Sequence, residues 1–97
     1  MRFPETAPAL AAALADADGA VRAESAGALG DMGETRWLQP MMALLRDPDP
    51  QVRARTAHAM GDLGATASMA ALAALTDDGD AHVAAEARWA LRELQEL

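Results

Sequence analysis

The chain contains the stretch Asp47-Pro-Asp-Pro-Gln-Val-Arg-Ala-Arg-Thr-Ala-His-Ala-Met-Gly-Asp-Leu-Gly64, and nearly the same stretch, Asp16 to Gly33, lies 31 residues before it. Ten of the 18 aligned positions are identical. A weaker third copy runs from Asp78 to Leu94. A fixed period of this size is typical of proteins built from stacked repeats. Such proteins present an extended surface more readily than a closed catalytic cleft.

Each copy is predicted to form the second helix of a helix pair. Aspartate precedes these helices as the N-cap, because its carboxylate accepts the free amide hydrogens of the first turn. The caps are Asp18, Asp49 and Asp80, and the first buried residues are Val21, Val52 and Val83. The buried stripe is expected to continue through Ala26, Leu29, Met32, Ala57, Met60 and Leu63, and Gly33 and Gly64 are expected to end the helices.

The first helices are expected at about residues 6–15, 35–46 and 66–76. The segment 35–46 has Leu38, Met41, Met42 and Leu45 at helical spacing on one face. The sequence therefore predicts an all-α protein, an α-solenoid of three helix pairs and six helices. It is expected to form a single domain over residues 1–97, with units at about 4–33, 34–64 and 65–97.

Glycine recurs inside the second helices, at Gly30 and Gly61, where it costs about 1 kcal/mol relative to alanine. Its repetition at one phase predicts that the neighbouring helix comes too close for a side chain. The third copy has Arg92 at this position, as expected for a terminal repeat with a more polar outer face. Arg22 and Arg53 also recur, and we expect them to pair with inter-helix aspartates such as Asp16 or Asp47.

Composition narrows the functional classes. The net charge is −7, and all eight basic residues are arginine. An acidic chain repels phosphate backbones, so nucleic acid is not an expected partner. No apolar run is long enough to span a bilayer, so no membrane association is expected. The lack of cysteine fits a reducing compartment, and a cytoplasmic location is expected.

The stretch from Asp47 to Gly64 resembles the HEAT-like repeat of the phycobilisome-lyase type. The preceding segment 35–47 matches the first helix of that repeat, including its internal proline at Pro40. The resemblance covers essentially the whole chain, with two good copies and one degraded copy. It implies a right-handed stack of antiparallel HEAT-like helix pairs, whose second helices line a concave face. It implies no activity, because members include chromophore-lyase subunits, a metal-dependent hydroxylase, DNA glycosylases and scaffolds.

No metal, cofactor or catalytic group is expected. The hydroxylase members of the family carry His-Glu pairs directly after the Val-Arg of their second helices. Here those positions read Ala23-Glu24, Ala54-Arg55 and Ala85-Glu86, so the histidine is missing each time. The two histidines, His58 and His82, occupy non-equivalent repeat positions, which does not favour convergent metal ligands.

The exposed strip of the second helices is the predicted binding surface, and it holds Glu24, Asp31, Arg55, His58, Asp62, Glu86, Trp89 and Glu93. We expect a non-enzymatic interaction module that binds a basic protein or peptide. Trp89 is the predicted anchor, because the equivalent positions hold Gly27 and His58 and packing does not call for a large side chain. An ordinary solvated helix face is the alternative for the strip, and a cover over the stack's end is the alternative for Trp89.

Three further interpretations stay open at this point. The protein is alternatively an accessory subunit or fragment of a chromophore-lyase-like enzyme. A homodimer is conceivable through end-to-end pairing of apolar residues, with Leu10 and Leu14 at one end and Leu91 and Leu94 at the other. Trp37 is expected to pack in the crease between units rather than to bind a partner.

Overall fold

The computed structural model describes residues 6–97. Every regular element in that range is helical, as the sequence predicts. The elements are α1 (Thr6–Ala13), α2 (Gly19–Asp31), α3 (Leu38–Ala43), the 3₁₀ segment η1 (Leu44–Arg46), α4 (Pro50–Asp62), the 3₁₀ segment η2 (Thr66–Ser68), α5 (Met69–Leu75) and α6 (Ala81–Gln95). Within this range, none of the helices combines the length and the apolar character that crossing a bilayer requires.

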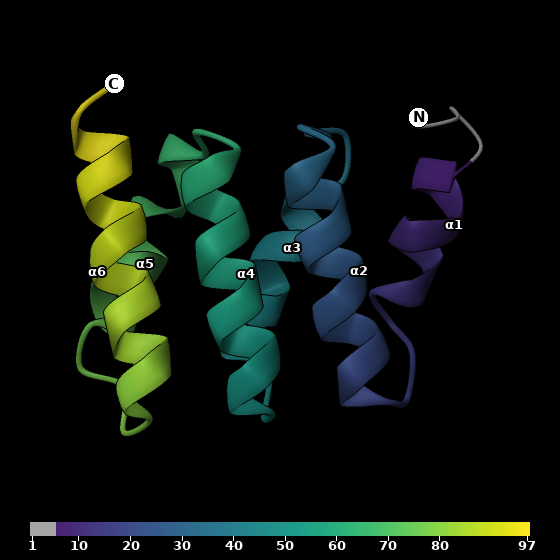
Figure 1. The fold of residues 1–97 in the computed structure, drawn as a ribbon, viewed down its shortest axis with the longest axis horizontal. Coiled ribbons are helices and arrows are strands. Elements are labelled where there is room, and N and C mark those ends of the chain that lie inside the picture. The colour runs from purple at the N-terminus through teal and green to yellow at the C-terminus, as the bar shows by residue number, and fades with distance from the viewer. Residues whose placement is uncertain (1–5) are drawn as a thin grey trace.

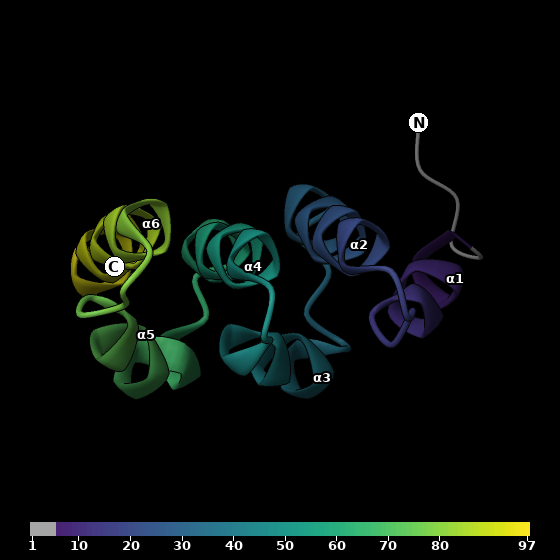
Figure 2. The same ribbon diagram turned by 90° about the horizontal axis from the view of Figure 1, so that it is seen from below.

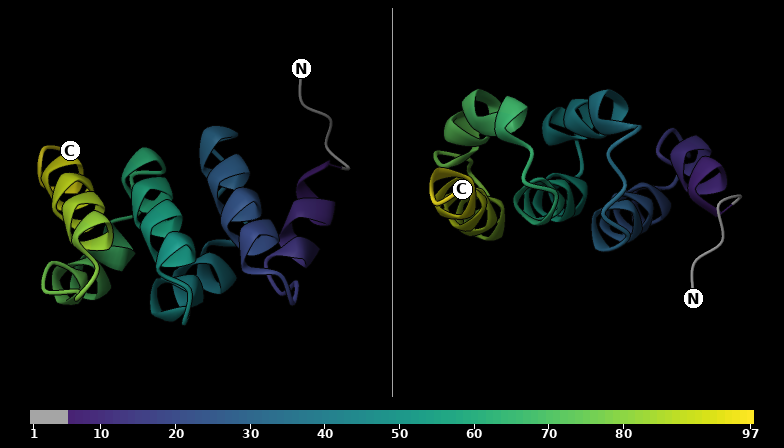
Figure 3. Two further views of the ribbon diagram at one scale, coloured as in Figure 1. Left: turned by 60° about the horizontal axis from the view of Figure 1, so that its bottom comes forward. Right: turned by 90° about the horizontal axis from the view of Figure 1, so that it is seen from above.

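The helices form two rows. α2, α4 and α6 lie side by side in one row, and α3 and α5 lie behind them (Figures 1 and 2). α1 lies at the end of the stack beside α2 (Figure 2), and the two views of Figure 3 show the same arrangement. We call the side of α2, α4 and α6 that is turned away from α3 and α5 the second-helix face.

An Asp-x-Asp motif starts each second helix. The second aspartate is the N-cap: Asp18, Asp49 and Asp80 accept the N–H of Ala20, Gln51 and His82, each at 2.9 Å. The first aspartate, two residues earlier, accepts the N–H of the cap residue itself, at 2.8–2.9 Å. α2 and α4 are each followed, two residues after their last residue, by a glycine, Gly33 or Gly64, whose φ angles of +68° and +65° are costly for other residues.

Arginine connects successive units. Arg22 binds Asp47 through two hydrogen bonds of 2.8 and 3.0 Å and donates to the main-chain oxygens of residues 16 and 17. Arg53 repeats the pattern with Asp78, at 3.0 and 3.2 Å, and with the main-chain oxygens of residues 47 and 48. The predicted pairing of these arginines with inter-helix aspartates is therefore confirmed, and it joins neighbouring units.

The two bound carboxyls have lowered pKa values. The hydrogen bonds from Arg22 hold the pKa of Asp47 below its ordinary value, although partial burial opposes this. Arg53 lowers the pKa of Asp78 in the same way. Both carboxylates are therefore stabilised in the charged form that the pairing needs.

The helix-interior glycines mark close approaches, as predicted. A Cβ built on Gly30 would lie 2.8 Å from the Cβ of Ala59 in α4. A Cβ on Gly61 would lie 2.6 Å from Cζ3 of Trp89 and 3.1 Å from Cα of Ala90 in α6. Real Cβ contacts are longer than this, so glycine permits the spacing of the second-helix row.

The core follows the predicted stripe except at its edges. Val52, Val83, Leu29, Met41 and Met60 are fully buried. Val21, Met32 and Leu63, also expected in the core, are only half-buried. Val21 lines a hollow together with Leu10 of α1, and α2 is the last helix of the described second-helix row on the α1 side (Figure 2).

Two of the leucines proposed for end-to-end pairing are unavailable. Leu14 and Leu94 are 5% and 3% exposed and belong to the chain's own core. Leu10 and Leu91 are half-buried against that core. Leu14 and Leu94 therefore cannot take part in end-to-end pairing, whereas Leu10 and Leu91 keep part of their surface exposed and the homodimer stays a prediction.

The first helices are shorter than expected. The segment 35–46 begins its helix only at Leu38 and tightens to 3₁₀ after Ala43. Pro40 explains the late start: it has no N–H and fits only in a first turn, where amide hydrogens lack helical partners. Trp37, just before this helix, is half-buried against the core, in line with a packing role, and the Arg36 guanidinium lies 4.5 Å from its ring centroid.

Candidate functional site

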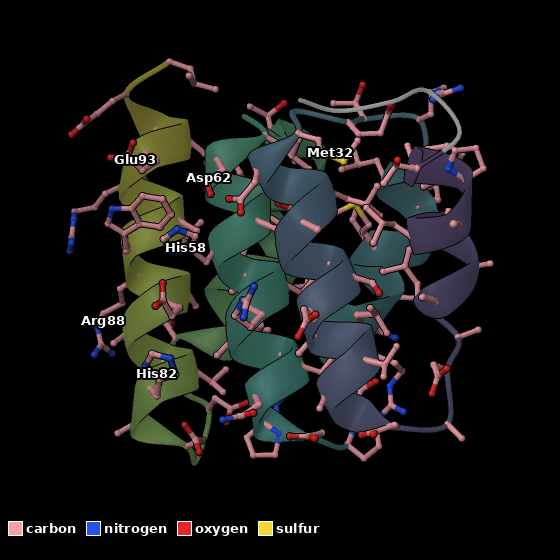
Figure 4. All side chains as sticks on the ribbon, turned by 45° about the vertical axis from the view of Figure 1, so that its right-hand side comes forward. Met32, His58, Asp62, His82, Arg88 and Glu93 are labelled. Atoms are coloured by element: carbon pink, nitrogen blue, oxygen red, sulfur yellow. The ribbon has the colours of Figure 1, made fainter. Side chains whose placement is uncertain are left out.

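All eight predicted site residues lie on α2, α4 and α6, and the structure brings most of them together. A hollow of about 320 Å³ on the second-helix face is lined by five of them: Asp31, Arg55, His58, Asp62 and Glu86. An adjoining hollow of about 220 Å³ is lined by Glu24 and, again, Arg55. Trp89 adjoins His58, and Glu93 lies nearer the C-terminal end of α6, outside the hollow (Figure 4).

His58 links α4 to α6 at the centre of this surface. Its Nδ1 lies 2.9 Å from Oε1 of Glu86, and its Nε2 lies 3.4 Å from Oδ2 of Asp62, one helical turn along α4. Both ring nitrogens therefore face carboxylates. The ring is held in one orientation, which makes His58 a pre-ordered polar group on an exposed surface.

Trp89 is held by packing, contrary to prediction. Its ring stacks on the His58 imidazole, with centroids 4.3 Å apart and an interplanar angle of 8°. Its Cζ3 occupies the space that a side chain at residue 61 would fill. The expectation that packing does not call for a large residue here was wrong, because the space opened by Gly61 in α4 is filled by Trp89 from α6.

Arg55 is the one predicted site residue with a permanent positive charge. Its guanidinium crosses from α4 to α2 and lies over Gly27. Among residues 6–97 it forms no ion pair, unlike Arg22 and Arg53, whose guanidinium groups are paired. Glycine at position 27 leaves room for this crossing, and the flexible end of the arginine can move away.

Most of the other predicted site residues carry carboxylates. Glu24, Asp31, Asp62 and Glu93 are exposed, and Glu86 is half-buried beside the two histidines. Asp31, Asp62 and Glu93 occupy one repeat position, each 31 residues from the next. The surface thus presents negative charge at a regular spacing from helix to helix.

Sequence reasoning missed His82. It lines both hollows, and its Nε2 lies 3.9 Å from Oε2 of Glu86. Its repeat equivalents are Ala20 and Gln51, so the repeat alignment gives no signal. The usable signal is the four-residue spacing between His82 and Glu86, which places both on one side of α6.

Metal binding finds no support in this arrangement. Across the described part of the chain, no three side chains of histidine, cysteine, aspartate or glutamate converge as a metal ion would require. The contacts of His58 are instead hydrogen-bonded or ionic pairs with carboxylates.

Known protein families give one match. The sequence model of the family described as HEAT repeats matches residues 6–92. No curated protein matches the chain.

Proposed function

Because the chain belongs to the HEAT-repeat family, whose members commonly mediate protein–protein interaction, we propose that it is a non-enzymatic module binding a basic segment of another protein on its second-helix face. The supporting observation is charge. Five of the eight predicted site residues carry carboxylates, namely Glu24, Asp31, Asp62, Glu86 and Glu93, and one, Arg55, carries a guanidinium. Complementary charge accelerates encounter and rejects partners of the wrong sign.

The repeat geometry narrows the form of the partner. Asp31, Asp62 and Glu93 recur once per helix along the row. Packed helices lie about 8–10 Å apart. A polyproline II segment advances about 3.1 Å per residue with three residues per turn, so every third side chain points to the same side. Three residues of such a segment therefore match one helix spacing. The preferred partner is a polyproline II segment that crosses α2, α4 and α6 with arginine or lysine at every third position.

Arg55 sets a further requirement. Its unpaired guanidinium lies between the hollows and repels a segment that is cationic throughout. A neutral or acidic residue is therefore preferred where the partner passes over α4 near Arg55. Specificity of this kind comes from the repulsive element as much as from the attractive ones.

Trp89 contributes to this surface mainly by placing His58. The His58 imidazole is fixed by the stacking contact with Trp89 and by the carboxylates of Glu86 and Asp62. It therefore loses little conformational entropy when a partner binds. We keep Trp89 in the proposed site for this reason, and not as a side chain free to insert into a partner.

Synthetic peptides test the proposal directly. The probe is a twelve-residue peptide with arginine at every third position and serine between, compared with a peptide of the same composition whose arginines are contiguous. We expect tighter binding of the spaced peptide by fluorescence anisotropy at low salt, and weakening as salt rises. Equal affinity for both peptides would remove the geometric argument, and no binding of either would refute the function.

Matched variants locate the binding surface. Asp31→Asn with Asp62→Asn removes two charges from the second-helix face and is expected to weaken binding of the spaced peptide. Asp77→Asn with Glu96→Gln removes two exposed charges elsewhere and leaves affinity nearly unchanged. Equal effects of the two pairs would show that net charge alone is responsible.

Within the family we assign the chain to the phycobilisome-lyase type, on its resemblance over residues 35–64. This assignment brings no activity with it. The hollow on the second-helix face has about 320 Å³, near the lower limit of ligand pockets, and nothing in its lining favours a tetrapyrrole.

A further inference from the structure

The row of second helices has two different ends, and the α2 end has the chemistry of an internal junction. In α4, Ala59 meets Gly30 of α2 and is 1% exposed, and Val52, two turns earlier, is 0% exposed. Their equivalents in α6, Val83 and Ala90, are both 0% exposed. In α2 the same repeat positions hold Val21 and Ala28, and these are only half-buried.

The open side of α2 is apolar and hollowed. A depression of about 180 Å³ lies there, lined by Leu10, Ala20, Val21, Glu24, Ser25 and Ala28. Figure 2 shows that the row stops at α2 on this side, with α1 lying lower and beside it. The surface thus matches the one by which α4 receives α2 and α6 receives α4.

The arginine pairing has an open position at the same end. Asp47 and Asp78 each receive a guanidinium from the preceding unit, from Arg22 and Arg53. Asp16 is their repeat equivalent. Among residues 6–97 no guanidinium reaches its carboxylate, which accepts only the N–H of Asp18 at 2.8 Å. An arginine donor at this end would complete the series.

The α6 end lacks the matching features. Ala84 stands at the repeat position of Arg22 and Arg53, so α6 has no arginine at that position. In α4, Gly61 faces α6 and Ala54 and Ala57 are buried. The equivalent positions of α6 hold Ala85, Arg88 and Arg92, which are all exposed. A second copy of this chain therefore cannot supply at its α6 end the surface that the α2 end fits.

From these contacts we infer that the open side of α2 is a docking surface for a HEAT-type helix pair of a partner protein. That helix pair carries an arginine that reaches Asp16, and glycine or alanine where Gly30 and Gly61 stand in this chain. The small residues of the partner leave room for Val21 and Ala28. Its arginine pairs with Asp16 through two hydrogen bonds, as Arg22 does with Asp47. This surface adjoins the second-helix face and shares Ala20 and Glu24 with it, but the pairing at Asp16 does not depend on the proposed function.

A covalent fusion supplies such a helix pair in register. A copy of residues 34–64 placed directly before Phe3 continues the 31-residue period and points its Arg53 at Asp16. We expect the melting temperature of the fusion to exceed that of the original chain. Asp16→Asn should remove much of this gain, while leaving the original chain unchanged, because asparagine still accepts the Asp18 N–H through its amide oxygen.

The same copy attached after Gln95 is the matched control. It also continues the period, but it meets Ala84, Arg88 and Arg92, so we expect no upward shift in melting temperature. The inference is overturned if the fusion before Phe3 gives no gain, or if its gain is insensitive to Asp16→Asn. It is equally overturned if Asp16→Asn destabilises the original chain, because Asp16 would then already be paired.

Discussion

Substituting the two neighbouring glycines of α2 should shift stability in opposite directions. In a helix interior, replacing glycine by alanine gains about 1 kcal/mol. At Gly30 the new Cβ would lie 2.8 Å from Cβ and 3.1 Å from Cα of Ala59. Carbon atoms pack best at about 3.5–4.0 Å, so α4 would have to retreat by roughly 0.5–1 Å. The Arg22–Asp47 pair resists that movement.

The cost at Gly30 should therefore exceed the gain. Overpacking a well-packed contact costs about 1–3 kcal/mol, so Gly30→Ala is expected to destabilise the protein by about 1 kcal/mol net. For a domain of this size, that lowers the melting temperature by about 4–8 °C. Circular dichroism at 222 nm during heating measures it.

Gly27→Ala is the matched control in the same helix. Its Cβ would meet only the flexible end of Arg55, which can swing into solvent. The helix-propensity gain should then dominate, and the melting temperature should rise. If both variants raise the melting temperature by the same amount, the close approach of α2 and α4 is not the reason for glycine at position 30, and the packing argument fails.

Three other perturbations have definite expected results. Arg53→Ala removes two hydrogen bonds to Asp78 and two to main-chain oxygens. The free energy of unfolding, measured by urea denaturation, should fall by about 2 kcal/mol, and the affinity for the spaced arginine peptide should not change. The pKa values of Asp47 and Asp78 are lowered in the folded state, so their contribution to the free energy of unfolding is full above about pH 5. Below about pH 4 the carboxyls of the unfolded chain bind protons first, and stability should fall. A wild-type stability profile that is flat from about pH 5 to about pH 2.5 would contradict this. Thr56→Val replaces a buried hydroxyl that has no hydrogen-bond partner, so the protein should gain about 1 kcal/mol of stability. Ser25→Ala removes a hydroxyl that donates to the Val21 carbonyl, so the protein should lose stability. A stability change of the same sign in both variants would refute this account of the two hydroxyls.

The repeat determines how much of the fold can be predicted from sequence. Residues that recur every 31 positions act in the same way each time. The capping by Asp18, Asp49 and Asp80, the pairing of Arg22 and Arg53, and the close approach at Gly30 and Gly61 could all be derived before any coordinates. Repetition supplies evidence that a single copy lacks, because a chance residue is not repeated at one phase.

The candidate site was less predictable because it depends on residues that do not recur. Trp89 of α6 fills the space above Gly61 of α4 and stacks on His58. At the preceding junction Arg55 of α4 lies over Gly27 of α2, from a different repeat position. Two different side chains thus fill the space next to a glycine at successive helix junctions. Periodicity indicates which positions are exposed, but contacts between helices decide which of these side chains remain free to bind.

The weaker third copy is best explained by position in the stack. Two residues that recur in all three copies stay in the core of α6: Val83 and Ala90 are both buried. It differs where α2 and α4 face a following unit, and there it has Ala84 without a donor and the exposed Arg88 and Arg92. The asymmetry follows if α6 forms a polar outer surface, while the open side of α2 keeps an apolar surface and an unfilled arginine position.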